Sequence, residues 1–341
     1  MIEEAVPKSF VLLRTFAAFL TALVVTLLMG PLLIRWLKTR FRERIVTGSS
    51  RLNELHAAKK ETPTMGGVLI MLGVAVSSVA WCNRSNLLLW LFLLLAVGLT
   101  LVGGLDDWIK ATTKSSGISA RRKLILQCVM CLPSSYGLYE ILKQSDSHLT
   151  ILFIPWGVLV LVATSNSVNL TDGLDGLATG VCLPVILLFV TILIVAGSSE
   201  PTGILSTPAV PGTAEVAVLM AGLGGAMTGF LWFNGYPAQV FMGDAGSLSI
   251  GGLIGFAALS CRQEFLLLVA GGVLVAETLS VIVQVAGFKL TGRRLLRCSP
   301  LHHHFVFGGV PEGRIVVRFW IVSGVLAMVG LLVVADFDVI W

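Results

Sequence analysis

The sequence predicts an all-α integral membrane protein, and three features of its 341 residues point to this fold class. Hydrophobic residues make up 55% of the chain and charged residues only 13%, whereas a soluble domain carries roughly 25% charged residues. The mean hydropathy is +0.90. Apolar runs of about 20 residues recur along the chain, and a helix of that length spans the ~30 Å of hydrocarbon in a bilayer.

Ten transmembrane helices are expected from these runs. The fourth is the weakest, because Pro133, Ser134, Ser135 and Glu140 interrupt it. Short connections make successive spans alternate in direction, so the segments between them fall into two sets. The ten spans cover residues 10–35, 66–82, 87–105, 124–142, 150–165, 176–197, 214–233, 246–261, 264–287 and 316–335.

The two sets of connecting segments differ in basic residues. The lysine- and arginine-rich set consists of 36–65, 106–123, 166–175, 234–245 and 288–315. The other set, which includes both termini, carries only Lys8, Arg14, Arg84, Lys143 and Arg262. By the positive-inside rule the rich set faces the cytoplasm and both termini lie on the extracytoplasmic side. This basic face would suit anionic lipid head groups or a phosphorylated substrate.

The five cytoplasmic segments also carry the unusual carboxylates, which predicts one active site within a single membrane domain, residues 1–341. Asp106 and Asp107 are adjacent, at the expected end of a helix, where the dipole is unfavourable to acids. Asp172 and Asp175 are three apart, so a helical turn would put both on one side. Asp244 stands alone in "MGDAGS". Carboxylates at the edge of the hydrocarbon usually line an ion or substrate path. They suit Mg²⁺, which completes its shell with phosphate oxygens; helix capping is the alternative for some of them.

Three consecutive histidines, His302, His303 and His304, follow Pro300. On an irregular loop their side chains could point in different directions and donate to phosphate oxygens. Zinc is a competing interpretation, although consecutive ligands suit its geometry poorly and no second cluster completes a set. A solvated surface run is the third. The Cys128-x-x-Cys131 spacing lies within a predicted span, which favours packing over a metal.

Six motifs together resemble one family, the phospho-N-acetylmuramoyl-pentapeptide transferases within the polyprenyl-phosphate hexosamine-1-phosphate transferases. They are "TPTMGG", "LDDWIK", "NLTDGLDGLA", "PAQVFMGDAGSL", "QVAGFKLTGRR" and "PLHHHF", and they occur in the family's order and at its spacings over nearly the whole chain. The resemblance implies ten membrane helices with both ends outside, a homodimer, and a multi-pass protein of the bacterial cytoplasmic (inner) membrane. Its active site would lie on the cytoplasmic face.

The resemblance also implies a reaction and a set of site residues. Phospho-MurNAc-pentapeptide would move from UDP-MurNAc-pentapeptide to undecaprenyl phosphate, giving lipid I and UMP with Mg²⁺, the first membrane step of peptidoglycan synthesis. Asp244 would be the principal Mg²⁺ ligand, with Asp106 and Asp107 as the catalytic pair near the lipid phosphate. The uridine pocket would be lined by Asn169, Asp172, Asp175, Asn234 and Phe241, with Lys59 and Thr64 closing over it.

Further substrate contacts follow from the same motifs. His303 and His304, with His302, would meet the diphosphate or the sugar, and Gln284 would lie nearby. Apart from the motifs, the basic residues of segment 106–123 would gather the phosphates, with a role in topology alone as the alternative for about half of them; they are Lys110, Lys114, Arg121, Arg122 and Lys123. The chain departs from the family pattern at Glu61, Ala245 and Val306, and these departures bear on substrate details such as the peptide more than on the reaction.

The mechanism and the function class each have a rival at this stage. A lipid monophosphate has a second pKa near 6, so one-step attack with Asp106 accepting a residual proton is favoured over an aspartyl-phosphate intermediate. A polyprenyl-phosphate GlcNAc-1-phosphate transferase is the alternative enzyme. An ion-coupled transporter is the alternative class, and Glu277, inside the ninth span, fits it better. However, no internal repeat supports a transporter. Nucleic acid is not expected as a partner.

Overall fold

The computed structural model describes residues 8–40, 62–113, 115, 117–144, 148–197, 210 and 212–335. Lys59, Glu61 and Lys114 lie outside these ranges, so the predictions made for them stay predictions. Most of the described residues are helical, as the composition predicts. The helices are α1 (Lys8–Arg40), α3 (Gly67–Trp81), α4 (Leu87–Thr112), α5 (Ala120–Leu142), α6 (Phe153–Thr171), α7 (Leu177–Ala196), α8 (Thr213–Asn234), α9 (Gly243–Ser260), α10 (Leu266–Ala270), α11 (Gly272–Thr291), α12 (Leu301–Phe307) and α13 (Glu312–Ala335).

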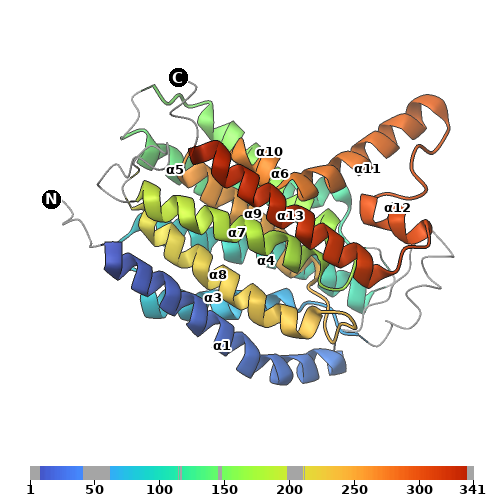
Figure 1. Ribbon diagram of the computed structural model, residues 1–341, viewed down its shortest axis with the longest axis horizontal. Helices are drawn as coiled ribbons and strands as arrows, with labels where there is room; N and C mark the ends of the chain where they lie inside the picture. Colours follow the sequence, from blue (N-terminus) through green and yellow to red (C-terminus); the bar gives the residue numbers. More distant parts are fainter. Residues whose placement is uncertain are drawn as a thin grey trace.

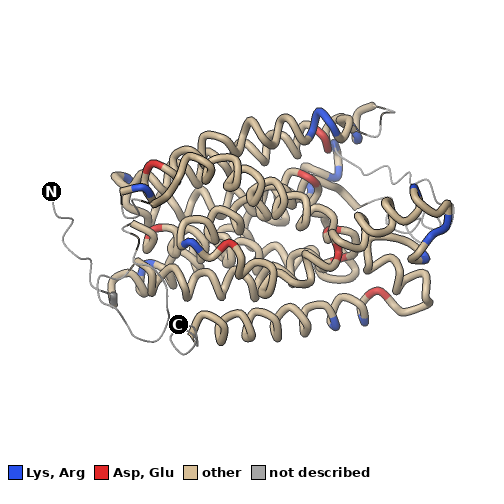
Figure 2. The backbone as a smooth tube through the Cα atoms, turned by 90° about the horizontal axis from the view of Figure 1, so that it is seen from above, with Lys and Arg blue, Asp and Glu red and all other residues tan. Residues whose placement is uncertain are grey.

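The long helices run side by side as one bundle (Figure 1). The start of α1 and the end of α13 lie at the same end of the bundle, while α12 lies at the other. Charged residues lie mostly towards the two ends of the bundle, and the stretch of backbone between them carries few among the described residues (Figure 2). This distribution is expected of a bundle whose middle faces hydrocarbon.

Eight of the described helices are long and apolar enough to cross a membrane: α1, α4, α5, α6, α7, α8, α11 and α13. The second and eighth predicted spans, 66–82 and 246–261, are occupied by α3 and α9, which do not meet that measure. With 15 residues, α3 is about 22 Å long at 1.5 Å per residue, which is short of the hydrocarbon thickness. The number of crossings therefore stays a prediction.

One of the predicted spans is not a continuous helix. The run 264–287 was expected as a single helix, but it is split into α10 and α11 by Gly271, which belongs to neither helix. By contrast, the weakly predicted fourth span forms one helix, α5, with Pro133 inside it. Beyond the break, α11 leans away from the bundle before the chain returns through α12 to α13 (Figure 1).

The central helix of the bundle is α9, which is buried on every side from Ala245 to Ser260. Glycines at its contacts let neighbouring helices approach to backbone distance. A Cβ on Gly67 of α3 would overlap the backbone of Gly246, and one on Gly103 of α4 would overlap the carbonyl of Asp244. Small residues commonly allow such close approach in membrane bundles. The start of α9 is thereby held directly against α4, which carries the Asp106–Asp107 pair.

Candidate active site

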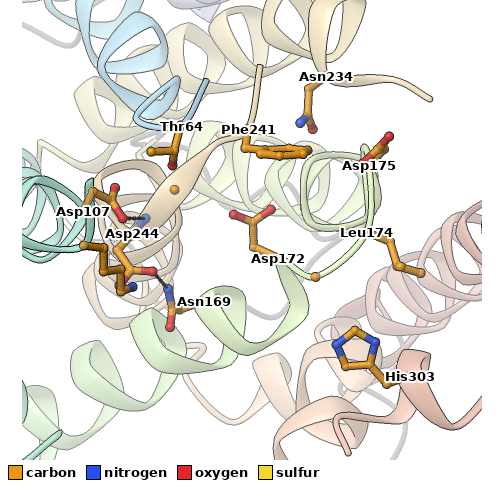
Figure 3. A pocket seen from close by; sticks show the side chains of 13 residues that line it. Thr64, Asp107, Asn169, Asp172, Leu174, Asp175, Asn234, Phe241, Asp244 and His303 are labelled. Atoms are coloured by element: carbon orange, nitrogen blue, oxygen red, sulfur yellow. Dashed lines mark hydrogen bonds and ion pairs between the residues drawn. The ribbon is translucent and has the colours of Figure 1, made fainter. Parts of the chain in front are cut away.

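A cavity of about 240 Å³ lies where the starts of α7 and α9 meet the ends of α6 and α8. Figure 3 shows the side chains that surround it. The lining residues are Thr64, Asp107, Lys110, Asn169, Asp172, Gly173, Leu174, Asp175, Asn234, Phe241, Gly243, Asp244 and His303. Ten of the residues predicted for the site are among them, although they come from segments far apart in the sequence. The predicted convergence of distant segments is therefore observed.

One wall of the cavity is built by backbone pairing between two loops. The N–H groups of Gly66 and Gly67 donate to the carbonyls of Phe241 and Met242, each at 2.8 Å, and Phe241 N–H donates to Pro63 O at 2.8 Å. Gly243, with φ of 73°, then turns the chain into α9, a conformation that favours glycine. These contacts place Thr64 and Phe241 on the same side of the cavity, with the Phe241 ring close to Asp172 (Figure 3).

Asp244 is the most heavily bonded side chain of the site. Its Oδ1 accepts a hydrogen bond from Asn169 Nδ2 at 2.6 Å, and its Oδ2 accepts from Lys110 Nζ at 2.9 Å and from Lys123 Nζ. Asn169 Nδ2 also donates to Ser247 Oγ at 2.9 Å. Asp244 precedes the apolar part of α9. Burial by itself would raise the pKa of its carboxyl, but the interaction with Asp106 and the charges of Lys123 and Lys110 outweigh burial and hold this pKa below its usual range.

The two aspartates of α4 have different surroundings. Asp107 accepts hydrogen bonds from Asp244 N at 3.1 Å and Ala245 N at 3.0 Å, so its carboxylate caps the first turn of α9. Asp106 accepts from Ile118 N at 2.5 Å, and its Oδ2 lies 2.8 Å from Lys110 Nζ, one turn further along α4. The sequence predicted that this pair would end the helix. This prediction is wrong, because α4 continues to Thr112. The unfavourable helix end is thus avoided, and Asp107 meets the favourable N-terminus of another helix.

The Asp172–Asp175 stretch forms the turn between α6 and α7. Asp175 Oδ2 accepts from Ala238 N at 3.0 Å. Asn234 joins the same elements: its Oδ1 accepts from Thr179 Oγ1 at 3.0 Å, and its Nδ2 donates to Val240 O at 3.0 Å. Both polar ends of Asn234 are engaged within the protein, so its contribution is to hold α7 against the loop that carries Phe241. Asp172 reaches towards the middle of the cavity (Figure 3).

The histidines lie on a short helix, α12, and not on the irregular loop that the sequence predicted. Successive side chains on a helix point about 100° apart, so the three cannot face one ligand together. Only His303 lines the cavity. His302 is fully buried, and His304 Nδ1 accepts a hydrogen bond from Arg297 N at 3.2 Å.

The remaining predicted residues within the described ranges are not part of the cavity wall. Gln284 Oε1 accepts from Leu295 N at 3.1 Å and Leu296 N at 2.8 Å, which ties the loop after α11 back to that helix. Asp106 contacts Lys110, and Lys123 contacts Asp244, so each is linked to a residue of the cavity wall. Gly173 and Gly243 also line the wall. The residues that the sequence analysis did not name are Leu174 in the wall and Ser247 behind Asn169. The three-residue spacing of Asp244 and Ser247 on one helix could have indicated the last of these.

Comparison with known proteins bears on this arrangement. Residues 89–262, from α4 to α9, match the family model described as glycosyl transferase family 4. A phospho-N-acetylmuramoyl-pentapeptide-transferase of Oleidesulfovibrio alaskensis is 44% identical over 94% of this chain and 93% of its own length. The chain belongs to the phospho-N-acetylmuramoyl-pentapeptide-transferase family. Transferases of the same name from Maridesulfovibrio salexigens and Nitratidesulfovibrio vulgaris are 42% and 44% identical, again over 94% of this chain and 93% of their own.

The charge of the cavity wall suggests how a member of this transferase family would hold a cation. Four carboxylates line it, and Lys110 is the one ammonium group among the lining residues. Within the described ranges, no group of three His, Cys, Asp or Glu side chains could hold a metal ion by itself. Mg²⁺ needs only one or two carboxylates when phosphate oxygens complete its shell. Asp244, with Asp172 in the same wall, would suit Mg²⁺ that arrives with a phosphorylated substrate, provided that Lys110 and Lys123 release Asp244 Oδ2.

Proposed function

We propose that this chain transfers phospho-MurNAc-pentapeptide from UDP-MurNAc-pentapeptide to undecaprenyl phosphate, giving lipid I and UMP in a Mg²⁺-dependent reaction. The name that its relatives share supports phospho-MurNAc-pentapeptide as the group that is transferred. The observation that carries the proposal is the cavity itself, in which four carboxylates and one lysine surround an aromatic ring. A wall of this charge would repel a nucleotide diphosphate unless a divalent cation came with it.

Each residue of the site then has a defined task. The Phe241 ring offers a stacking surface for the uracil base. Asp244 and Asp172 would hold Mg²⁺, which supplies charge neutralisation of the diphosphate and of the leaving UMP. Asp107 fixes Asp244 by holding the first turn of α9. These residues position and neutralise the reacting groups, which is most of what a phosphoryl transfer requires.

Lys110 and Lys123 contact both Asp106 and Asp244, so they lie between the proposed base and the proposed metal ligand. This position suits the phosphate of the lipid acceptor, which would draw on both ammonium groups. Asp106 would accept the residual proton of that phosphate in a one-step attack. The rival route forms an aspartyl-phosphate first.

The membrane arrangement proposed with this function has ten crossings, both termini outside, and the cavity at the cytoplasmic face of the inner membrane. The common end of α1 and α13 supports an even number of crossings. The basic residues Arg293, Arg294 and Arg297 follow α11 near α12, and such residues favour the cytoplasmic side. A homodimer is part of the proposal on the strength of the family resemblance.

Chromatographic detection of UMP tests the function directly. Purified protein in detergent, with UDP-MurNAc-pentapeptide, undecaprenyl phosphate and Mg²⁺, should release UMP and form a lipid-linked product whose mass includes the pentapeptide. Release should stop with EDTA and return with added Mg²⁺. Release only from UDP-GlcNAc would favour the GlcNAc-1-phosphate transferase instead. No release from either donor, with folded protein, would contradict a transferase function.

A further inference from the structure

Glu277 lies in the second turn of α11, and its side chain is completely buried. It does not line the cavity, so it takes no direct part in the chemistry proposed above. A buried carboxyl is costly unless hydrogen-bond donors surround it. Its partners therefore indicate what it stabilises.

Those partners belong to α12. Oε1 and Oε2 of Glu277 accept from the backbone N–H of His302 at 3.1 and 3.4 Å, in the first turn of that helix. Oε2 also lies 3.2 Å from Nδ1 of the His302 ring. One carboxyl thus accepts hydrogen bonds from the backbone of His302 and lies against the ring of the same residue. A negative group at a helix start is also favoured by the backbone dipoles there.

The far side of the His302 ring is packed against the turn between α6 and α7. A Cβ on Gly173 would overlap Nε2 of His302, and Gly173 separates Asp172 from Leu174 in the cavity wall. The His302 ring is fully buried and cannot easily swing aside. The ring of His303 lies 4.2 Å from it, centroid to centroid, and faces the cavity.

We infer that Glu277 is a positioning residue of the donor site: by fixing His302 against Gly173 it sets the distance between His303 and the Asp172–Asp175 turn. Glu277, His302 and Gly173 form a rigid spacer across two walls of the cavity. This inference rests on the proposed function, because the group placed between His303 and Asp172 would be the diphosphate or sugar of the nucleotide donor. The acceptor lipid is expected at Lys110 and Lys123, which contact Asp244.

Kinetics of Glu277→Gln provide the first test. The amide keeps the size of the side chain and one acceptor for the His302 N–H, but removes the charge. The KM for UDP-MurNAc-pentapeptide should rise about tenfold, as expected for one weakened charge-assisted contact, while the KM for undecaprenyl phosphate stays within about twofold. In the His303→Ala background the same change should raise the donor KM less than about threefold, because residues that act through one another are not additive.

Gly173→Ala should displace the His302 ring from the opposite side, because the added Cβ would overlap Nε2 of that ring. It should therefore also raise the KM for the nucleotide donor and leave the KM for the lipid unchanged. Gly313→Ala is the matched control, since a Cβ there meets nothing within 4 Å, and it should leave both KM values unchanged. Thermal unfolding of each variant reports whether it is folded. Should Glu277→Gln fail to fold, Gly173→Ala decides the question by the same two KM values.

Equal changes in both KM values would overturn the inference, as would a Glu277→Gln effect of full size in the His303→Ala background. Either result would leave Glu277 with a purely structural role. Failure of the proposed function would look different, because the wild-type protein itself would then release no UMP.

Discussion

Replacement of Asp107 by Asn separates a chemical role of this aspartate from the capping role seen in the structure. Both carboxylate oxygens accept backbone N–H groups of α9, from Asp244 at 3.1 Å and Ala245 at 3.0 Å. An Asn can accept only one of them, and its NH₂ group would face the other N–H. The change loses one hydrogen bond to a charged acceptor, worth about 1.5–3 kcal/mol, and an anion at a helix N-terminus, worth about 0.3–1 kcal/mol.

The expected cost for Asp107→Asn is therefore at most about 2–4 kcal/mol of folding stability, the sum of these two contributions, because burial and the nearby Asp244 raise the pKa of Asp107 and so oppose its charge. The loss of the cap should also displace Asp244, because Asp244 belongs to the turn that Asp107 caps. We expect a lower Tm in detergent than for the wild type, together with reduced UMP release and a higher Mg²⁺ concentration for half-maximal rate. Differential scanning fluorimetry and a Mg²⁺ titration of the rate measure these quantities.

Asp106→Asn is the matched control for Asp107→Asn, because it lies next in the chain but accepts from Ile118 N and not from α9. Its Tm should also fall, because Asn cannot form ion pairs with Lys110 and Lys123, but its Mg²⁺ dependence should change little. If Asp107→Asn abolished UMP release with an unchanged Tm and unchanged Mg²⁺ dependence, the capping argument would be refuted. Asp107 would then act on the substrate itself.

Four further outcomes are expected. Phe241→Ala should raise the donor KM about ten- to hundredfold with a smaller change in kcat, because base stacking contributes about 1–3 kcal/mol; an unchanged KM would remove Phe241 from the uridine pocket. Asp244→Asn should lose most activity and recover part of it with extra Mg²⁺, whereas a loss insensitive to Mg²⁺ would assign the metal elsewhere. The kcat loss of Asp106→Asn should shrink as pH rises above the lipid phosphate pKa near 6, and a stoichiometric burst of UMP without acceptor lipid would contradict this one-step route. Glu215→Gln should lower Tm without changing either KM, since Glu215 pairs with buried Arg14 at 2.6 Å and breaking such a pair costs about 3–5 kcal/mol; a selective KM change would argue against a structural role.

The sequence by itself determined the helical membrane class, the approximate extent of the helices and most of the residues at the site. These properties are local or compositional. An apolar run of the right length is a helix in lipid whatever surrounds it, because its backbone groups must bond to one another. The ordered motifs identified Asp172, Phe241 and Asp244 for the site, and all three line one cavity. Even the break at Gly271 changes the shape of one span and not its place in the chain.

What each polar side chain does was decided only by the tertiary structure. Asp107 and Asp244 are 137 residues apart in the sequence, and nothing in "LDDWIK" indicates that the second aspartate caps a distant helix while the first meets two lysines. The same holds for Glu277: its place in an apolar span favours ion transport, whereas in the structure its carboxyl accepts hydrogen bonds from the backbone of His302. A carboxyl owes its role to the donors that surround it. In this protein those donors come from helices that meet only when the bundle is packed.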